Sequence, residues 1–367
     1  MRQIRRKQNR RSIWGFLALS AALICWLARP GLVTGSAREG LELCAGVMIP
    51  SLFPFFVMSN LFIRRNYHQY VTSALRPLMG PLFGLSGSAA GALALGAVGG
   101  YPIGAATAFR LYDRGELSAG QTSRLLMFCN NAGPGFIFGV IGMGLLGSVR
   151  AGALLYGIHL LSAVLIGAAI HAFADRPQVA PAAGGAAASA AEPPAESFPV
   201  SFVESVREAA EAMLNVCAFL VFFSVILSFL RTSFLWNGAC RGLHAAFGIQ
   251  PSVTDALLDG TMELSTGISC LKQAGGTESA QMVCSLLLLG WGGLCVHCQV
   301  LSLRGGRSVP MGPYFAGKAA QAVVSVLVLL LFRLQPILGA AICLLFLFGC
   351  ASASRKKSAG KTAAYHV

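Results

Sequence analysis

Apolar runs, each near the length that crosses a bilayer, recur along this chain and restrict its fold more than any other feature. A helix needs about 20 consecutive, mostly apolar residues to span the hydrocarbon core, and the runs Leu154 to Phe173 and Tyr314 to Phe332 are examples. Only 11% of the 367 residues are charged and 55% are hydrophobic, whereas a globular chain carries roughly a quarter charged residues. The sequence therefore predicts an all-α polytopic membrane protein.

The basic residues gather at the two ends of the chain. The formal net charge is +14, and the opening "MRQIRRKQNRR" holds six cations while the tail "RKKSAGK" holds four. Cytoplasmic segments of membrane proteins are enriched in Lys and Arg. We therefore expect both termini in the cytoplasm and an even number of full crossings. Nucleic-acid binding is not expected, because no sustained basic and aromatic face is present.

The apolar stretch Ile13 to Leu27 follows the basic head directly. This arrangement also fits a secretory signal peptide, with a cleavage site near Gly35-Ser36-Ala37. An uncleaved first transmembrane helix is favoured, and cleavage stays open.

No cofactor or enzyme signature is present in the sequence. Most of the eleven cysteines lie in apolar runs, where they behave as small hydrophobes. Cys295, His297 and Cys298 carry donor atoms that zinc uses, but a closed site needs about four ligands and no second pair stands nearby. Hydrolase and nucleotide-binding motifs are missing. We expect no metal, no cofactor and no catalysis; a coupling ion, proton or sodium, stays undetermined.

Two apolar segments of the first half are interrupted by residues that break helices. "VGGYPIG" places Tyr101 and Pro102 in the middle of one segment, and "FCNNAGPGF" places Asn130, Asn131 and Gly133 in the middle of another. Irregular backbone at membrane depth is tolerated only where protein buries it or where it lines a wet cavity. Each segment is predicted to be two half-helices. Prolines in "IPSLFPFF" predict a further kink or break near Pro50 and Pro54.

The second half repeats this order of elements. An entry helix, a broken segment, a short polar connector, a glycine-interrupted segment and a plain helix follow one another in both halves, and "WGGLCVHCQ" stands opposite "FCNNAGPGF". Residues 174–199 between the halves are rich in Ala, Pro and Gly and predict a flexible linker. Paired interrupted helices at corresponding positions indicate a transporter site near the bilayer midplane. Tight helix packing around glycines is the alternative.

The polar residues of the broken segments are the candidate substrate-binding residues. They are Tyr101, Pro102, Asn130, Asn131, Gly133, Glu263 and Gln299. Half-helix N-termini attract anions, amides donate and accept hydrogen bonds, and an acid inside a membrane segment indicates a substrate or ion route. The alternatives are that the asparagines cap their own backbone, that Tyr101 and Pro102 only kink a helix, and that Glu263 lies at the aqueous end of a short re-entrant piece.

The motifs "GGYPIGAATAFRLYDRGELSAGQTSRLLMFCNNAGPGFIFG", "PSLFPFFV" and "GWGGLCVHCQVLS" resemble the YlbJ-type sporulation integral membrane proteins, also called stage V sporulation protein V, which carry the nucleoside-recognition or Gate domain. The resemblance runs from about Gly40 to Phe348. It implies a fold like that of the concentrative nucleoside transporters, with two related halves and broken or re-entrant helices. It also implies that dipicolinic acid moves across the outer forespore membrane during endospore formation.

With this resemblance, the chain is expected to divide into five parts. Residues 1–36 hold the basic N-terminus and first helix, 37–173 a first Gate-like repeat, 174–199 the linker, 200–350 a second Gate-like repeat with the last helices, and 351–367 a basic cytoplasmic tail. The expected partners are a small anionic substrate such as dipicolinate and the lipid bilayer; a homo-oligomer stays open. Two other functions stay open: nucleoside or nucleobase transport, and a membrane scaffold for spore envelope assembly.

Overall fold

The fold is helical throughout the part of the chain that the structure, a computed structural model, describes, namely residues 2–173 and 197–364. Six helices in these ranges are long and apolar enough to cross a membrane: Pro30–Arg64, Val149–Phe173, Phe198–Arg231, Glu278–Arg304, Gly312–Leu334 and Pro336–Ala353. The prediction of an all-α polytopic membrane protein is confirmed. Most of the predicted linker, at 174–196, lies outside the described residues.

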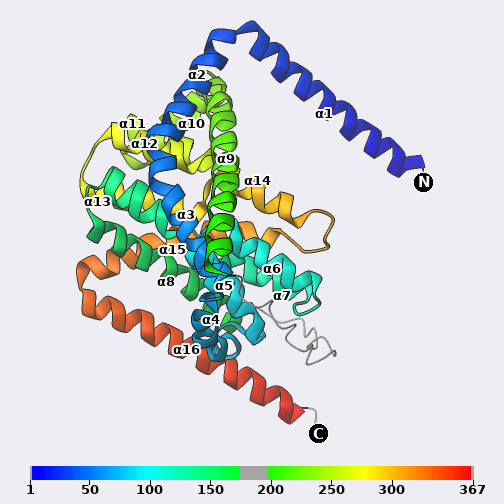
Figure 1. The fold of residues 1–367 in the computed structure, drawn as a ribbon, viewed down its shortest axis with the longest axis vertical. Helices are drawn as coiled ribbons and strands as arrows, with labels where there is room; N and C mark the ends of the chain where they lie inside the picture. Colours follow the sequence, from blue (N-terminus) through cyan, green and yellow to red (C-terminus); the bar gives the residue numbers. More distant parts are fainter. Residues whose placement is uncertain (1, 174–196, 365–367) are drawn as a thin grey trace.

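The first part of the chain runs from a long N-terminal helix to a plain helix that ends before the linker. α1 projects away from the rest of the molecule (Figure 1). The elements are α1 (Arg2–Ala28), α2 (Pro30–Leu43), η1 (Cys44–Met48), α3 (Ile49–Arg64), α4 (His68–Leu78), η2 (Met79–Phe83), η3 (Gly87–Ala89), α5 (Ala90–Gly99), α6 (Ile103–Asp113), α7 (Ala119–Cys129), η4 (Gly135–Leu145) and α8 (Val149–Phe173).

The second part contains a similar succession of helices and one more at the end. Its elements are α9 (Phe198–Arg231), α10 (Phe234–Phe247), α11 (Pro251–Met262), α12 (Leu264–Ala274), α13 (Glu278–Trp291), α14 (Gly293–Arg304), α15 (Gly312–Leu334) and α16 (Pro336–Ala364).

The order of elements is the same in the two parts. The long helices formed by α2 with α3 and by α9 come first and pack side by side (Figure 1). A short helix follows each of them, α4 and α10. Next come the broken pairs α5/α6 and α11/α12, then the broken pairs α7/η4 and α13/α14, and finally the unbroken α8 and α15, which also contact each other.

The proline-rich entry helix, predicted to kink or break near Pro50 and Pro54, is not broken. Residues Pro30 to Arg64 form one helical run, in which the five-residue π-helical turn Cys44–Met48 comes just before Pro50. A proline ring collides with the carbonyl one turn earlier in an α-helix. A wider π turn at this point gives the chain room for the ring, and Pro54 stays inside α3.

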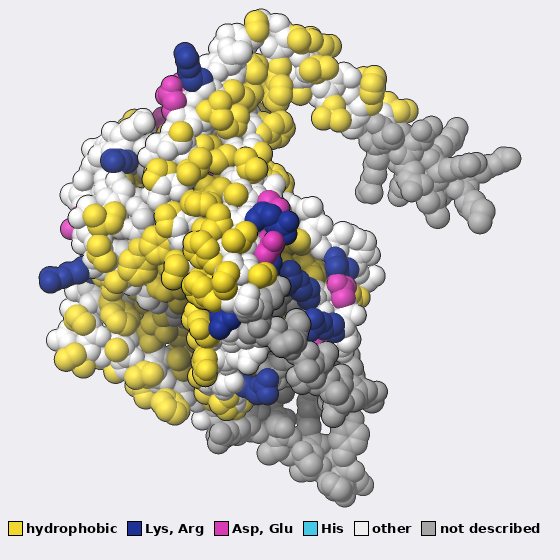
Figure 2. Space-filling model, viewed as in Figure 1, with side chains coloured by type: hydrophobic (Ala, Val, Ile, Leu, Met, Phe, Trp, Pro, Cys, Tyr) yellow, Lys and Arg dark blue, Asp and Glu magenta, His cyan; other side chains and the backbone are white. Residues whose placement is uncertain are grey.

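The described surface is largely apolar, as the fold class requires. Figure 2 shows hydrophobic side chains over most of one face, with few Lys, Arg, Asp and Glu side chains among them. On α9 and α16, Leu214 is 71% exposed and Leu345 is 70% exposed. Exposed apolar surface on this scale suits contact with lipid rather than with water.

Candidate functional site

Both broken segments of the first part meet at a close approach between two glycines. α5 ends at Gly99 and α6 begins at Ile103, and Gly100 between them has a φ of 76°. A Cβ on Gly100 would lie 2.7 Å from the backbone nitrogen of Gly133, which belongs to the break between α7 and η4. Only glycine permits this combination of backbone conformation and distance. The prediction that each of these segments consists of two half-helices is confirmed.

The two broken segments of the second part also meet. α11 ends at Met262 and α12 begins at Leu264, with Glu263 extended between them at φ −138° and ψ 115°. α13 ends at Trp291, and Gly292 turns the chain into α14 with a φ of 91°. A Cβ on the next glycine, Gly293, would lie 3.2 Å from the backbone nitrogen of Leu264.

Tyr101 joins the two pairs of breaks. Its hydroxyl donates a hydrogen bond of 2.7 Å to the backbone oxygen of Leu289, near the end of α13. A Cβ on Gly292 would lie 3.4 Å from the same hydroxyl oxygen. All four helix breaks, two from each part of the chain, therefore gather at one place in the fold.

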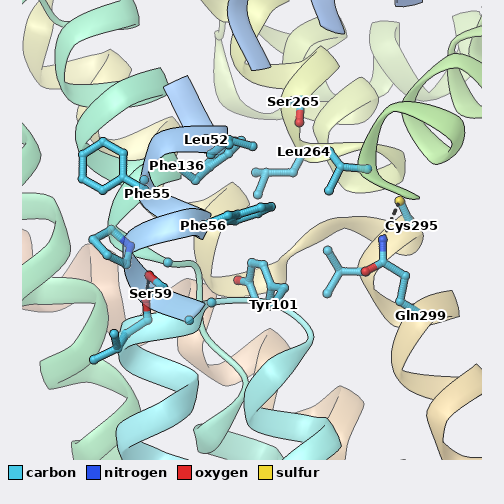
Figure 3. A pocket seen from close by; sticks show the side chains of 18 of the residues that line it. Leu52, Phe55, Phe56, Ser59, Tyr101, Phe136, Leu264, Ser265, Cys295 and Gln299 are labelled. Carbon is cyan, nitrogen blue, oxygen red and sulfur yellow. Dashed lines mark hydrogen bonds between the residues drawn. The ribbon is translucent and has the colours of Figure 1, made fainter. Parts of the chain in front are cut away.

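A pocket lies where the four breaks gather. Its empty space, with the open mouth included, is about 700 Å³. Figure 3 shows Tyr101 at the centre, with Leu52, Phe55 and Phe56 of α3 on one side and Cys295 and Gln299 of α14 on the other. The lining residues are Leu52, Phe55, Phe56, Ser59, Val98, Gly99, Gly100, Tyr101, Gly133, Pro134, Gly135, Phe136, Val216, Glu263, Leu264, Ser265, Cys295, Val296 and Gln299.

Four of the predicted site residues line this pocket and three do not. The residues that line it are Tyr101, Gly133, Glu263 and Gln299. The residues outside the lining are Pro102, Asn130 and Asn131.

Glu263 and Gln299 both make short-range contacts inside the second part. The Glu263 carboxylate accepts hydrogen bonds from the backbone nitrogens of Ser265, at 3.0 Å, and Thr266, at 2.6 Å. It therefore caps α12 with a full negative charge at the positive end of that helix. Gln299 donates from Nε2 to the sulfur of Cys295 at 3.5 Å.

Asn131 is part of a polar network behind the pocket. Its Nδ2 donates to the backbone oxygen of Phe128 at 2.8 Å, which caps the end of α7 as Asn does in many turns. Its Oδ1 accepts from Nε2 of Gln321 at 2.8 Å, and the same nitrogen donates to the backbone oxygen of His159 at 3.1 Å. His159 in turn accepts from the backbone nitrogen of Ala132 at 3.1 Å. The break after α7 is held by side chains from α8 and α15.

Asn130 is fully buried and its carboxamide is not satisfied. The side chain faces the Tyr314 hydroxyl, but neither its oxygen nor its nitrogen has a partner in hydrogen-bonding geometry. Its backbone oxygen accepts a hydrogen bond of 2.9 Å from the Lys318 ammonium. A buried carboxamide without partners is costly in a structure that has no function for it.

Lys318, Gln321 and His159 were missed by the sequence analysis. Lys318 lies inside the run "YFAGKAAQAVVSVLVLL", which the pattern of residues predicts to be a plain apolar helix. A charged residue within a membrane segment is itself a signal of function, so Lys318 could have been found. His159, in the apolar run of α8, gave the same kind of signal, whereas the uncharged Gln321 did not.

The cysteine and histidine cluster of α14 does not assemble a metal site. His297 is fully buried and its Nδ1 lies 2.9 Å from the Tyr314 hydroxyl. Among the described residues, no group of three or more His, Cys, Asp or Glu side chains could hold a metal ion.

Two comparisons with known proteins give matches. A family model described as Gate, nucleoside recognition, matches residues 45–173. The sporulation integral membrane protein YlbJ of Bacillus subtilis (strain 168) is 26% identical over 337 residues, which cover 87% of this chain and 81% of that protein. No solved structure matches the chain. The family-model match contains the first two helix breaks, and the relative's match is long enough to include most of both parts.

Proposed function

We propose that this chain, which belongs to the YlbJ-type family of membrane proteins, transports a small planar solute across a membrane of a sporulating cell. The observation that carries the proposal is the meeting of four helix breaks around one pocket. Discontinuous helices that leave a cavity at their breaks are how many transporters hold a solute between two related halves. A packing role alone would not require a pocket at that point.

Dipicolinate is the solute that we propose first. Its pyridine ring suits the aromatic lining, to which Phe55, Phe56 and Tyr101 contribute. Its two carboxylates can accept hydrogen bonds from the backbone at the start of η4 and of α14, where half-helix N-termini carry partial positive charge. The third half-helix start in the lining, that of α12, is already occupied by the Glu263 carboxylate.

The proposed location follows from the relative and from the charge of the chain. The relative's name assigns it to sporulation, and we extend this to the outer forespore membrane for the present chain. Both termini are proposed to lie in the cytoplasm, because the basic residues concentrate there.

A nucleoside or nucleobase is the second candidate solute. Its support is the description of the matched family model, nucleoside recognition, and the charge of the pocket. The described lining contains the carboxylate of Glu263 but no Lys, Arg or His. A neutral base with N–H donors would not face the repulsion that a dianion meets near Glu263.

Purified protein in liposomes tests the function. Liposomes loaded with unlabelled dipicolinate should exchange it for labelled dipicolinate outside, and excess uridine should not compete. Exchange of uridine with no exchange of dipicolinate would favour nucleoside transport and contradict dipicolinate transport. Liposomes that exchange neither solute, from protein that still captures a spore-specific partner, would support the scaffold function instead.

Spores provide the matching test in the cell. A strain that lacks the protein should form spores with little dipicolinate, and spores with normal dipicolinate content would contradict the proposal.

A further inference from the structure

Lys318 is a fully buried lysine in α15, one of the helices long and apolar enough to cross a membrane. Its side chain lies on α15 with no exposed surface. The ammonium donates to the backbone oxygen of Asn130 at 2.9 Å and to Oε1 of Gln321 at 2.6 Å. Its nitrogen also lies 5.5 Å from the centre of the Tyr101 ring. Oxygen acceptors and an aromatic face are what a cation requires when water is absent.

The charge of this lysine is not balanced by an acid. Among the described residues, no Asp or Glu forms an ion pair with Lys318. An ammonium without a counter-ion is expensive in a low-dielectric interior, and a protein commonly avoids the cost by releasing the proton. The charge state of Lys318 therefore depends on the charges that lie near it.

The ammonium lies at the C-terminal end of a half-helix, the kind of place at which broken-helix transporters bind their coupling cation. α7 ends at Cys129, and the Asn130 carbonyl that accepts from Lys318 is the first one of the unwound segment. Half-helix C-terminal ends and unwound carbonyls are where such transporters coordinate sodium ions or protons. In this chain, Lys318 fills that position from within the protein.

The pocket and Lys318 share the ring of one tyrosine. Tyr101 lines the pocket, and Lys318 lies over the ring of the same residue. An anion in the pocket and the ammonium over the ring would attract each other through a medium that contains little water, where the attraction is strong.

We propose that Lys318 is the built-in cation of this transporter and that one proton, gained and lost at its Nζ, couples to each anion moved. A bound anion stabilises the ammonium. Binding of the anion in the pocket and protonation of Lys318 therefore occur together. When the anion leaves, one N–H bond of the ammonium breaks, its electron pair stays on nitrogen, and the proton passes to water on the open side. Sodium has no part in this cycle. The inference rests on the proposed transport function.

The other titratable groups around Lys318 come from three neighbouring helices. α7 contributes Cys129, α8 contributes His159, and α14 contributes His297, which contacts Tyr314 of α15 itself. α13 faces this part of α15 with Gly290 and neighbouring leucines, and α16 meets α15 near Leu331, 13 residues further along. Among the described titratable groups named here, Lys318 is the one that donates a hydrogen bond to the backbone oxygen of Asn130.

Two assays on liposomes that contain the purified protein measure solute transport and its coupling to protons separately. Exchange of labelled for unlabelled dipicolinate at equal pH on both sides needs no driving force and measures transport. Accumulation of dipicolinate under an acidic exterior, with the membrane potential held at zero, measures coupling. With one proton per solute, a difference of one pH unit supports at most about tenfold accumulation. A sodium gradient at equal pH should support none.

The Lys318→Met variant tests the residue, because methionine has a similar length and no charge. We expect it to lose proton-driven accumulation and to exchange dipicolinate more slowly, because the charge that attracts the anion is gone. Lys272→Met is the matched control, since Lys272 is exposed at the end of α12; it should behave as the wild type. Lys318→Arg keeps a positive charge that does not titrate. It should exchange dipicolinate without accumulating it.

Several results would overturn the proposal. They are accumulation driven by sodium in the wild type, no accumulation under an acidic exterior although exchange proceeds, and proton-driven accumulation by Lys318→Met or Lys318→Arg at the wild-type level. Absence of exchange in the wild type would instead reject the transport function on which the inference rests.

Discussion

The second broken segment of each part of the chain takes a similar place in the order of elements, but the two breaks are held by different means. The break between α7 and η4 spans five residues, 130–134, and is held by Lys318, Gln321 and His159 from two other helices. The break between α13 and α14 is one glycine turn at Gly292, with a φ of 91°. The first break is fixed by a buried network of side-chain hydrogen bonds. The second turns at one glycine, beside single hydrogen bonds from Trp291 Nε1 to the backbone oxygen of Thr261 and from the Tyr101 hydroxyl to that of Leu289.

This difference assigns different tasks to the two parts of the chain. A network of buried hydrogen bonds resists deformation, because every bond broken leaves an unsatisfied group. A glycine turn changes conformation at lower cost. We expect the first break to act as the fixed wall of the pocket and the second as the side that moves when the pocket opens.

Gln321→Leu should have the largest effect, since it removes the hub of the polar network. The ammonium of Lys318 and the carboxamide of Asn131 each lose a partner while they remain buried. The free energy of unfolding should fall by about 3 kcal/mol, measured by denaturant unfolding in detergent. Gln273→Leu is the control, because Gln273 is exposed on α12. Equal losses for the two variants would show that the network does not hold the break.

Gly292→Ala should have a smaller effect on stability and a specific effect on transport. An alanine in this left-handed conformation costs roughly 1–2 kcal/mol, and its methyl group would press on the Tyr101 hydroxyl. Gly248→Ala places the same left-handed strain, at φ 63° and ψ 19°, in open space. The Tm of thermal unfolding should fall by a similar amount in both variants. Solute exchange in liposomes should become slower only for Gly292→Ala. Slower exchange in both variants would contradict a specific role of the second break in transport.

Glu263→Gln tests the acid that caps α12 at the edge of the pocket. Glutamine keeps one acceptor oxygen, so the cap is weakened and the free energy of unfolding should fall by about 1 kcal/mol. Removal of the charge should also lower the dipicolinate concentration that gives half-maximal exchange. Glu278→Gln, at an exposed position in the first turn of α13, should leave that concentration unchanged. An unchanged value for Glu263→Gln would mean that the solute does not approach this carboxylate.

Asp113→Asn should have the smallest effect, at a contact between the two parts of the chain far from the breaks. Arg307 donates two hydrogen bonds to the exposed Asp113 carboxylate, and this lowers the pKa of Asp113 below its usual 3.8. A lowered pKa in the folded state contributes stability above the unfolded pKa, and this is lost as the pH falls through the folded pKa. The small difference in Tm between wild type and variant should therefore be constant above about pH 5 and vanish in stronger acid. A difference in Tm that persists in stronger acid would show that the charge of Asp113 is not its cause.

The sequence located the breaks but not what holds them. Gly100, Asn131, Glu263 and Gly292 lie at breaks because glycine, proline and short polar side chains interrupt helices locally, and local signals are visible in a sequence. The bond between Gln321 and Asn131 joins residues 190 positions apart. Nothing in either segment alone indicates the partner.

The same limit applies to the pocket. Tyr101, Gly133, Glu263 and Gln299 were expected at the site from their place in broken segments, and they line the pocket. Phe55, Phe56 and Val216 of the unbroken α3 and α9 line it too. Their side chains look like ordinary apolar residues of a membrane helix, so only the packing of the two long helices against the breaks reveals their place.

The most direct test of the account fills the pocket without touching a break. Val216 of α9 lines the pocket, whereas Leu214 on the same helix is 71% exposed. Exchange of dipicolinate in liposomes should be lost in Val216→Trp, because the indole occupies the space of the solute, and should be retained in Leu214→Trp. Wild-type exchange by a folded Val216→Trp protein would contradict the claim that the solute passes through the space between the four breaks.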